Sequence, residues 1–177
     1  MKNYAGIDPG KNGAIVLIKS DNTIIAEKTP LLGKEYNILE FKNIIKKLKD
    51  DYPDIHFIVE HVHAIFGVAA GATFEFGYGC GLIEGILVSL GISYTKVQPK
   101  EWQKLAFKGT AEIRKPDKVN KNGKTVIGRL DTKPMALLSA QRLFPDVNLK
   151  ATDRSTKAHE GIVDALLLAY YGKTTNL

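Results

Sequence analysis

The chain has 177 residues, of which 44% are hydrophobic and 25% charged, proportions typical of one globular domain with a continuous core. No stretch approaches the roughly 18 to 20 apolar residues of a membrane span, and the N-terminal MKNYAGID lacks the apolar core of a signal peptide. We therefore expect a single domain over residues 1–177, a cytoplasmic location and no membrane partner. The lone Cys80 excludes an intramolecular disulfide and a zinc site built from several cysteines.

The first third of the chain predicts three strands and a helix. Residues 4–7 and 14–18 are short apolar strands, separated by the turn-forming sequence DPGKNG. A tight turn at Asp21-Asn22 leads into a third strand over residues 23–27, which completes an antiparallel meander. Apolar residues at helical spacing then predict an amphipathic helix over residues 37–49.

The middle of the chain adds two more strands. Residues 55–60 form an apolar strand that we expect to pair parallel to the first one, because a helical crossover precedes it. A long helix over residues 73–90, a strand over 93–97 and a short helix over 99–106 follow. This order of elements predicts an α/β fold with a mixed five-stranded sheet flanked by helices.

A strongly basic segment interrupts the pattern. The chain carries a net charge of +6, and residues 108–133 hold eight Lys or Arg against three acids, a net +5. The segment has little apolar periodicity and contains Pro116, Gly123 and Gly128, so we interpret it as an insertion at about 108–132. Beside an acidic centre such a loop suits a polyanion, although a solvated insertion is the alternative.

Two more helices follow the insertion. The first is predicted from residue 132 or 133 to Phe144, where Pro145 stops it, and the second over about 158–171, ending at Gly172.

Carboxylates stand where a solvated acid is not expected. Asp8 and Glu60 follow apolar strands, and Glu160 and Asp164 lie in the last helix, four residues apart and so on one helical face. Converging buried acids repel one another unless a cation compensates their charge. Because Mg²⁺ prefers oxygen ligands and leaves positions for water and phosphate, phosphodiester hydrolysis is the leading chemical hypothesis.

Each acid also has a simpler explanation. Asp8 is a common capping residue for a DPG turn, Glu60 fits an exposed strand end, and Glu160 suits the first turn of a helix through the helix dipole. Asp164 is harder to explain in this way, since its neighbours in the helix are apolar.

Several motifs in series resemble a known family. These are GIDPG after the first strand, IVE at the end of a later strand, a Gly-rich helix, VQPKEW after the fifth strand, and DALLLA in the last helix. In this order they resemble the RuvC family of Holliday-junction resolvases, and the resemblance covers nearly the whole chain. It implies an RNase H-like fold and a homodimeric, metal-dependent endonuclease. Such an enzyme resolves four-way junctions by paired symmetric cuts that leave 5′-phosphates, in DNA recombination and repair.

The resemblance also implies roles for the acids. Asp8 would bridge two Mg²⁺ ions, for which Mn²⁺ can substitute, while Glu60 binds one of them and Asp164 binds from the last helix. No small-molecule cofactor is implied. The two ions would supply the nucleophile and stabilise the leaving oxygen.

The fourth ligand departs from the bacterial pattern. Bacterial members place an acid or histidine three residues before the final Asp, and that position is Gly161 here. Glu160 is then the fourth ligand, with Asp153 as the alternative. This variation resembles the phage and poxvirus members of the family, for which the location would be the host cytoplasm.

DNA contacts are expected from three places. In the family an aromatic residue three positions after the strand-end Glu helps to open the junction; that position is His63 here, and Phe66 is the alternative wedge. Trp102 is either a core residue or a platform for base stacking. The basic residues expected to contact DNA are Lys108, Arg114, Lys115, Lys118, Lys121, Lys124 and Lys157, of which Lys157 or Lys108 is also a candidate for stabilising the reacting phosphate.

Glycines recur every four residues in the long helix. Gly77, Gly81 and Gly85 share one face, although each glycine lowers helix stability by about 1 kcal/mol relative to alanine. The pattern predicts a close backbone approach. Packing on the sheet is the plainest explanation, and contact with a second subunit or with DNA is the alternative.

Two other functional classes stay open. One is a related nuclease with a different substrate, either a relaxed debranching enzyme or one that cuts RNA:DNA hybrids. The other is a nucleic-acid-binding module without catalysis, which the full set of acids disfavours.

Overall fold

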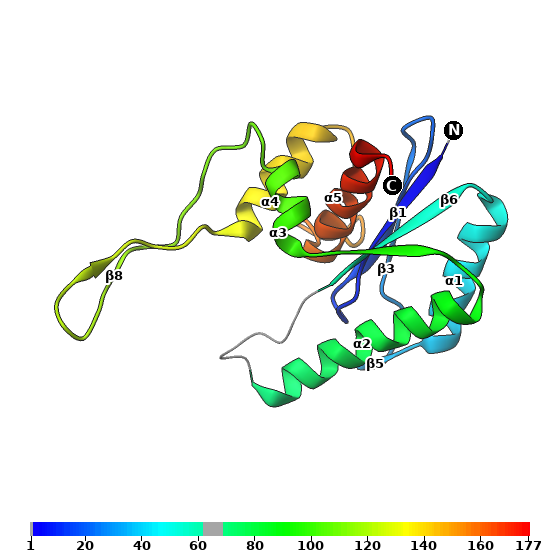
Figure 1. Ribbon diagram of the computed structural model, residues 1–177, viewed down its shortest axis with the longest axis horizontal. Coiled ribbons are helices and arrows are strands. Elements are labelled where there is room, and N and C mark those ends of the chain that lie inside the picture. The colour runs from blue at the N-terminus through cyan, green and yellow to red at the C-terminus, as the bar shows by residue number, and fades with distance from the viewer. Residues whose placement is uncertain (1, 62–68) are drawn as a thin grey trace.

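The computed structural model describes residues 2–61 and 69–177 (Figure 1). Its main sheet has five strands in the order β3-β2-β1-β6-β7. The first three strands form the expected antiparallel meander, and β6 and β7 run parallel to β1. The strands are β1 (Asn3–Asp8), β2 (Ala14–Ile18), β3 (Ile24–Lys28), β6 (Ile55–Glu60) and β7 (Tyr94–Val97). The predicted mixed α/β fold is confirmed.

Helices cover both faces of this sheet. On one face lie α1 (Ile38–Asp51) and α2 (Ala70–Ser89). The other face is covered by α3 (Pro99–Ala106), α4 (Thr132–Leu143) and α5 (Glu160–Thr175). Figure 1 shows the two groups on opposite sides of the strands.

The sheet separates two hydrophobic cores because side chains alternate along each strand. In β1, Ala5 and Ile7 pack with α1 and α2, whereas Tyr4 packs on the α5 side. Gly6 lies directly beneath α5, where a Cβ atom would come 2.1 Å from the Ala165 carbonyl oxygen. This close approach holds the last helix against the central strand and so positions its carboxylates.

The end of α5 differs from the prediction. Gly172 does not terminate the helix, which continues to Thr175. Instead Gly172 is buried, and a Cβ there would come 2.5 Å from a methyl carbon of Ile58. Asn176, at φ 54°, supplies the left-handed residue that ends the helix.

Two hairpins lie outside the main sheet. One pairs β4 (Leu31–Leu32) with β5 (Glu35–Tyr36), and the other pairs β8 (Lys118–Val119) with β9 (Thr125–Val126). The second lies within residues 108–132, the segment predicted to be a basic insertion. Residues 112–131, here called the basic arm, project from the body beside α3 and α4 (Figure 1).

The glycine stripe of α2 corrects one expectation. Among the described residues, no atom beyond the helix's own backbone lies within 4 Å of a Cβ built on Gly77, Gly81 or Gly85, so these glycines do not pack on the sheet. The close approach is made by Gly79, where a Cβ would come 2.4 Å from the Tyr36 hydroxyl. The stripe is therefore an exposed surface, which leaves the alternative of a second subunit or DNA.

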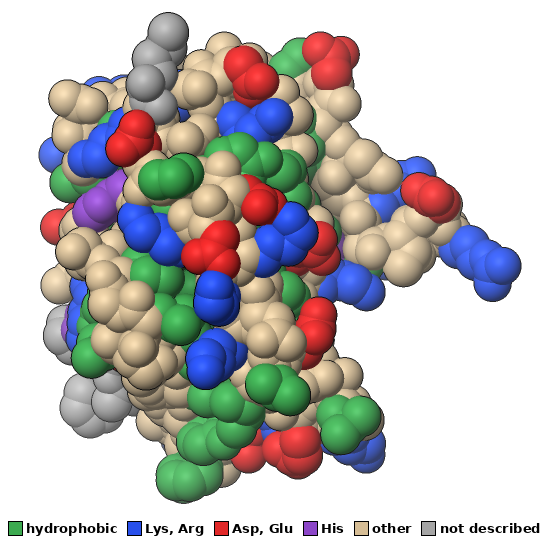
Figure 2. All heavy atoms as spheres, turned by 90° about the vertical axis from the view of Figure 1, so that its right-hand side faces the viewer, with side chains coloured by type: hydrophobic (Ala, Val, Ile, Leu, Met, Phe, Trp, Pro, Cys, Tyr) green, Lys and Arg blue, Asp and Glu red, His purple; other side chains and the backbone are tan. Residues whose placement is uncertain are grey.

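The solvent side of α1 mixes both signs of charge. Lys46 pairs with Asp50 and Lys47 with Asp51. Figure 2, which views the molecule from the right-hand side of Figure 1, shows basic and acidic side chains interspersed. None of the helices in the described ranges is long and apolar enough to cross a membrane.

Candidate functional site

The carboxylates of the candidate site come from three elements that meet at one end of the sheet. Ile7 of β1 lies opposite Val59 of the parallel strand β6, so Asp8 and Glu60, the last residues of these strands, reach the same sheet edge. Asp164 arrives from α5, which packs across β1. The strand-end acids are thus neighbours because parallel strands end on the same side.

Burial and mutual repulsion make these three acids hard to ionise. Burial is the largest cause in each case, and it raises the pKa of Asp8 to about 6, of Glu60 to about 7 and of Asp164 to about 8. The charge of Asp8 contributes to the raised pKa of both other acids. The three groups therefore form one electrostatic site at which a cation would be favoured.

Asp8 also has the local role that its sequence suggests. Its Oδ1 accepts a hydrogen bond from the backbone N–H of Gly10 at 3.3 Å, which lowers the pKa of the carboxyl against the effect of burial. The turn is tight enough that a Cβ on Gly13 would come 2.0 Å from the Asp8 carbonyl oxygen. Asp8 therefore caps the turn while its charge also raises the pKa of Glu60 and Asp164.

Glu60 is held by a residue that the sequence does not mark as functional. The Trp102 indole N–H donates a hydrogen bond to Oε1 of Glu60 at 2.9 Å, and only 1% of Trp102 is exposed. Trp102 is thus a core residue, and its ring is not available for stacking on bases. A buried indole N–H needs a hydrogen-bond acceptor, and a carboxylate at a strand end is a suitable one. This requirement is the signal in the sequence that could have linked Trp102 to the site.

The departure at Gly161 has a steric reason. A Cβ on Gly161 would come 2.2 Å from the Asn12 carbonyl oxygen and 2.6 Å from the Gly13 Cα. The first turn of α5 therefore lies directly on the turn after β1, and no acid or histidine fits at this position.

Glu160, one residue earlier, takes part in the acidic site. Its charge raises the pKa of both Asp8 and Asp164. It remains mostly exposed and accepts an ion-pair hydrogen bond from Lys133 Nζ at 2.6 Å. Asp153 is exposed in the segment before α5, and its charge is not a cause of the raised pKa of Asp8 or Glu60. The structure brings Glu160, rather than Asp153, to this site.

The donor set suits a hard divalent cation, since all four groups offer carboxylate oxygens. Over residues 2–61 and 69–177, however, no three His, Cys, Asp or Glu side chains are gathered closely enough to ligate one ion as they stand. The charges of these acids affect one another's pKa, but their oxygens do not form a complete metal-coordination shell as they stand.

The basic residues predicted to contact DNA lie in three places. Most lie on the exposed basic arm, where Arg114 also bonds to Glu112 at 3.0 Å and to the Gly128 carbonyl oxygen at 3.4 Å. Lys108 is exposed just after α3. The arm group comprises Arg114, Lys115, Lys118, Lys121 and Lys124.

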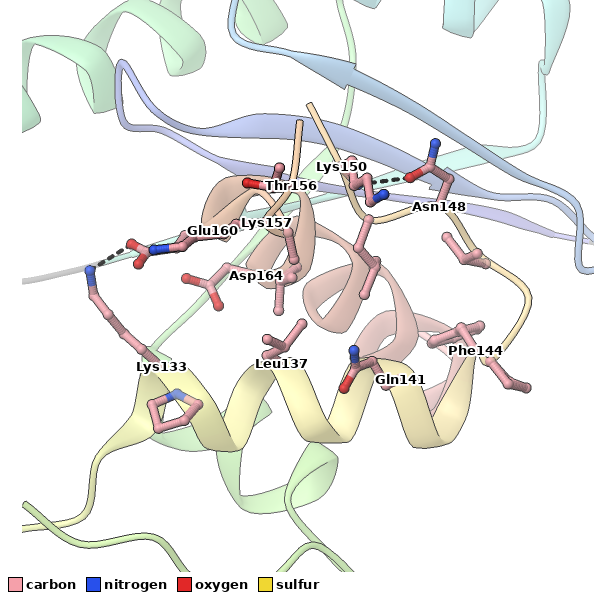
Figure 3. Close-up of a pocket in the computed structure, with 16 residues that line it drawn as sticks. Lys133, Leu137, Gln141, Phe144, Asn148, Lys150, Thr156, Lys157, Glu160 and Asp164 are labelled. Atoms are coloured by element: carbon pink, nitrogen blue, oxygen red, sulfur yellow. Dashed lines mark hydrogen bonds and ion pairs between the residues drawn. The ribbon is translucent and has the colours of Figure 1, made fainter. Parts of the chain in front are cut away.

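Lys157 lies apart from both the arm and Lys108. It lines a groove of about 640 Å³ that opens beside Glu160 and Asp164 (Figure 3). The two predicted wedge residues, His63 and Phe66, lie outside the described residues.

Comparison with known proteins shows what the fold is similar to. The sequence matches no protein-family model and no curated protein. Among solved structures, RuvC of T. thermophilus in complex with a Holliday junction substrate has a TM-score of 0.60 and 16% identity, over 99% of this chain and 95% of that one.

Two further structures agree. Another Thermus thermophilus RuvC structure has a TM-score of 0.56 and 16% identity, over 98% of this chain and 96% of that one. The yeast mitochondrial Holliday junction resolvase Ydc2 has a TM-score of 0.55 and 11% identity, over 96% of this chain and 77% of that one. The chain therefore has the fold that RuvC and the yeast mitochondrial resolvase share.

Proposed function

We propose that this protein is a metal-dependent, structure-selective endonuclease that resolves four-way DNA junctions. The observation that carries the proposal is the coupled set of Asp8, Glu60 and Asp164, whose pKa values are all raised, at one edge of a RuvC-like fold. A protein that buries three acids together gains most from this arrangement when a cation binds there. Metal-dependent nucleases use a bound cation of this kind to hydrolyse a phosphodiester.

The four carboxylates would hold two Mg²⁺ ions, with Mn²⁺ as a substitute. When bound, such ions supply an activated water and stabilise the leaving 3′ oxygen in an in-line displacement that leaves a 5′-phosphate. Asp8, Glu60 and Asp164 provide ligands from the fold's interior, and Glu160 provides the exposed one. The raised pKa values support this role, because a cation bound there would favour the charged carboxylates that burial disfavours.

Neighbouring side chains set the state of these ligands. Trp102 orients Glu60 through its hydrogen bond and favours the charged carboxylate. Lys133 holds Glu160 to the rim of the site, and its charge lowers the pKa of Asp164. Lys157 stands on the same groove as both helix acids and would contact a substrate phosphate.

Branched DNA is the proposed substrate for two reasons. The structure with the TM-score of 0.60 is that of a RuvC bound to a Holliday junction, and this chain matches it over 99% of its length. In addition, the basic arm offers exposed cations outside the acidic site, where they would neutralise phosphates of a bound duplex.

Two symmetric cuts require two active sites, so we propose a homodimer. The exposed glycine stripe of α2 supports this assembly, because glycines without side-chain neighbours permit another backbone to approach closely. A shallow groove beside it is lined by Ile38, Leu39, Gly81 and Leu82, among others. Replacing Gly81 with Leu would shift the protein from dimer to monomer in sedimentation velocity, whereas a monomeric wild type would contradict the assembly.

Cleavage of labelled synthetic substrates tests the function. The purified protein is incubated with a four-way junction, a flap, a linear duplex and an RNA:DNA hybrid, each with Mg²⁺ and with EDTA. We expect paired, symmetric, Mg²⁺-dependent nicks in the four-way junction. Equal cutting of several branched forms would identify a debranching nuclease, and cutting of the hybrid would indicate RNase H activity. Binding without cutting would support a non-catalytic module.

A further inference from the structure

A groove extends from the acidic site along α4. It has a volume of about 640 Å³ and runs between α4 and the segment 147–158 that precedes α5. In Figure 3, Glu160 and Asp164 stand at one end, Leu137 and Gln141 rise from α4 along its side, and Phe144 and Asn148 lie at the other end. The groove is thus a direct extension of the place where a phosphodiester would be cut.

Its lining is largely apolar. The apolar residues that face it include Pro134, Leu137, Phe144, Val147, Leu149 and Val163. A phosphate or sugar would gain little from such a surface, since these groups need hydrogen-bond partners when they leave water. The flat face of a nucleobase, by contrast, is apolar and matches it.

The groove also presents two side-chain amides, those of Gln141 on α4 and of Asn148 at the far end. Asn148 uses its side-chain oxygen to accept a hydrogen bond from the backbone N–H of Lys150 at 3.0 Å, which leaves its NH₂ group to donate. The side chain of Gln141 is exposed on α4, and within the described residues it makes no hydrogen bond. An apolar wall with a few polar groups that fix orientation is the usual design of a site for a heterocycle.

Charge and size complete the match. Lys150 and Lys157 also line the groove, and within the described residues neither has a carboxylate within 4 Å, so they are available to phosphates beside a base. The volume lies within the roughly 300 to 1,000 Å³ of small-molecule sites and is far too small for a duplex. A single nucleotide taken out of its stack fits these limits.

We propose that this groove receives one unpaired nucleobase adjacent to the phosphate to be cut, and that it sets a base preference for cleavage. The inference rests on the proposed function, and it names the part of the substrate that the site holds. Gln141 and Asn148 contact the edge of the base, the apolar wall contacts its face, and Lys157 contacts the neighbouring phosphate. Positioning the base in this way places the scissile phosphate beside Asp164.

The first test uses cleavage profiles on junctions with randomised bases around the crossover. Leu137→Trp fills the groove with an indole, and Leu138→Trp places the same side chain on a residue of α4 that is 43% exposed and does not line the groove. We expect the Leu137 variant to cut on the order of tenfold more slowly and the Leu138 variant to match the wild type. Equal rates and profiles in the two variants would overturn the inference.

A second variant avoids any question of folding. Gln141→Ala changes an exposed side chain, and we expect it to reduce the preference at one position by about tenfold, because a base-edge contact discriminates by that amount. Thermal melting of each variant serves as the check on folding. An unaltered base profile in this variant, together with a rate equal to that of wild type, would show that Gln141 does not read a base.

A binding measurement distinguishes failure of the groove proposal from failure of the proposed function. The Asp8→Asn variant is mixed with junctions that carry 2-aminopurine at the positions flanking the crossover, and fluorescence is recorded. We expect an increase at one position, which Leu137→Trp in the same background abolishes and Leu138→Trp preserves. A wild type that cuts nothing while this signal persists would overturn the function and leave the groove supported. A junction that binds without any such signal would overturn the groove, and absence of binding would overturn both.

Discussion

The acidic site and the basic arm carry charge in opposite ways. The acids are packed into the body, where burial raises the pKa values of Asp8, Glu60 and Asp164. The arm exposes its cations on a thin hairpin, and Arg114 is its only described basic residue with a carboxylate within 4 Å. Buried like charges require a compensating ion, whereas exposed ones attract a polyanion over a distance. From this difference we expect the acidic site to carry out catalysis and the basic arm to contribute affinity for DNA.

The largest effect is expected from removing an acid. Asp8→Asn and Asp164→Asn should each reduce junction cleavage at least about 100-fold, because a ligand to the catalytic ions is lost. Junction affinity should remain within a few-fold, since neither change touches the arm. Single-turnover cleavage and gel-shift titration measure the two quantities, and Asp153→Asn is the control. Full cleavage in both site variants would refute the metal-site assignment.

Changes in the basic arm should affect DNA binding rather than cleavage. Replacing Lys118, Lys121 and Lys124 with Gln should lower the slope of log affinity against log salt by about 2 to 3, because each phosphate contact contributes about 0.9. Cleavage at saturating enzyme should change little. Fluorescence anisotropy over a salt series measures the slope.

The matched control is the triple change of Lys46, Lys47 and Lys49 to Gln on α1, which alters the net charge equally. Two of these lysines pair with acids on their own helix. If both triple variants had the same slope, the arm would have no specific contact with phosphate.

A smaller effect is expected from the residue that positions Glu60. Trp102→Phe keeps an aromatic ring in the core but removes the N–H, so cleavage should fall roughly tenfold, as for other partners of metal ligands. The hydrogen bond lowers the pKa of Glu60, so its loss should also move the acidic limb of the pH–rate profile to higher pH. Phe107→Leu alters a ring that packs edge-on against Trp102 and serves as the packing control. An unshifted limb would mean that Trp102 only fills space.

The smallest effect concerns stability without metal. The raised pKa values mean that the folded protein holds protons that the unfolded chain has lost, so in EDTA the free energy of unfolding should fall as pH rises from about 4 to 8. Urea unfolding at several pH values measures it, and Asp164→Asn should reduce the fall. A steeper fall in that variant would contradict the burial of this acid.

Local patterns were sufficient to predict the five strands of the main sheet, the five helices of the described ranges and the four acids as candidates, but not the two short hairpins. Apolar alternation in strands, helical spacing in α1 and proline at the start of α3 depend on residues near one another in the chain, so the sequence displays them. The acids at the ends of apolar strands were visible for the same reason. The glycine stripe of α2 was visible too, but its outward direction was not.

Contacts between distant residues were decided only by the tertiary structure. Gly161 looks like a missing ligand until α5 is seen to lie on Asn12, and Trp102 looks like an ordinary core residue until Glu60 is seen to accept its N–H. The same holds for the groove beside Asp164, whose walls come from α4 and from the segment before α5. Composition and periodicity record which residues prefer burial. Which buried group meets which depends on how helices and strands pack, and that is settled by the whole chain.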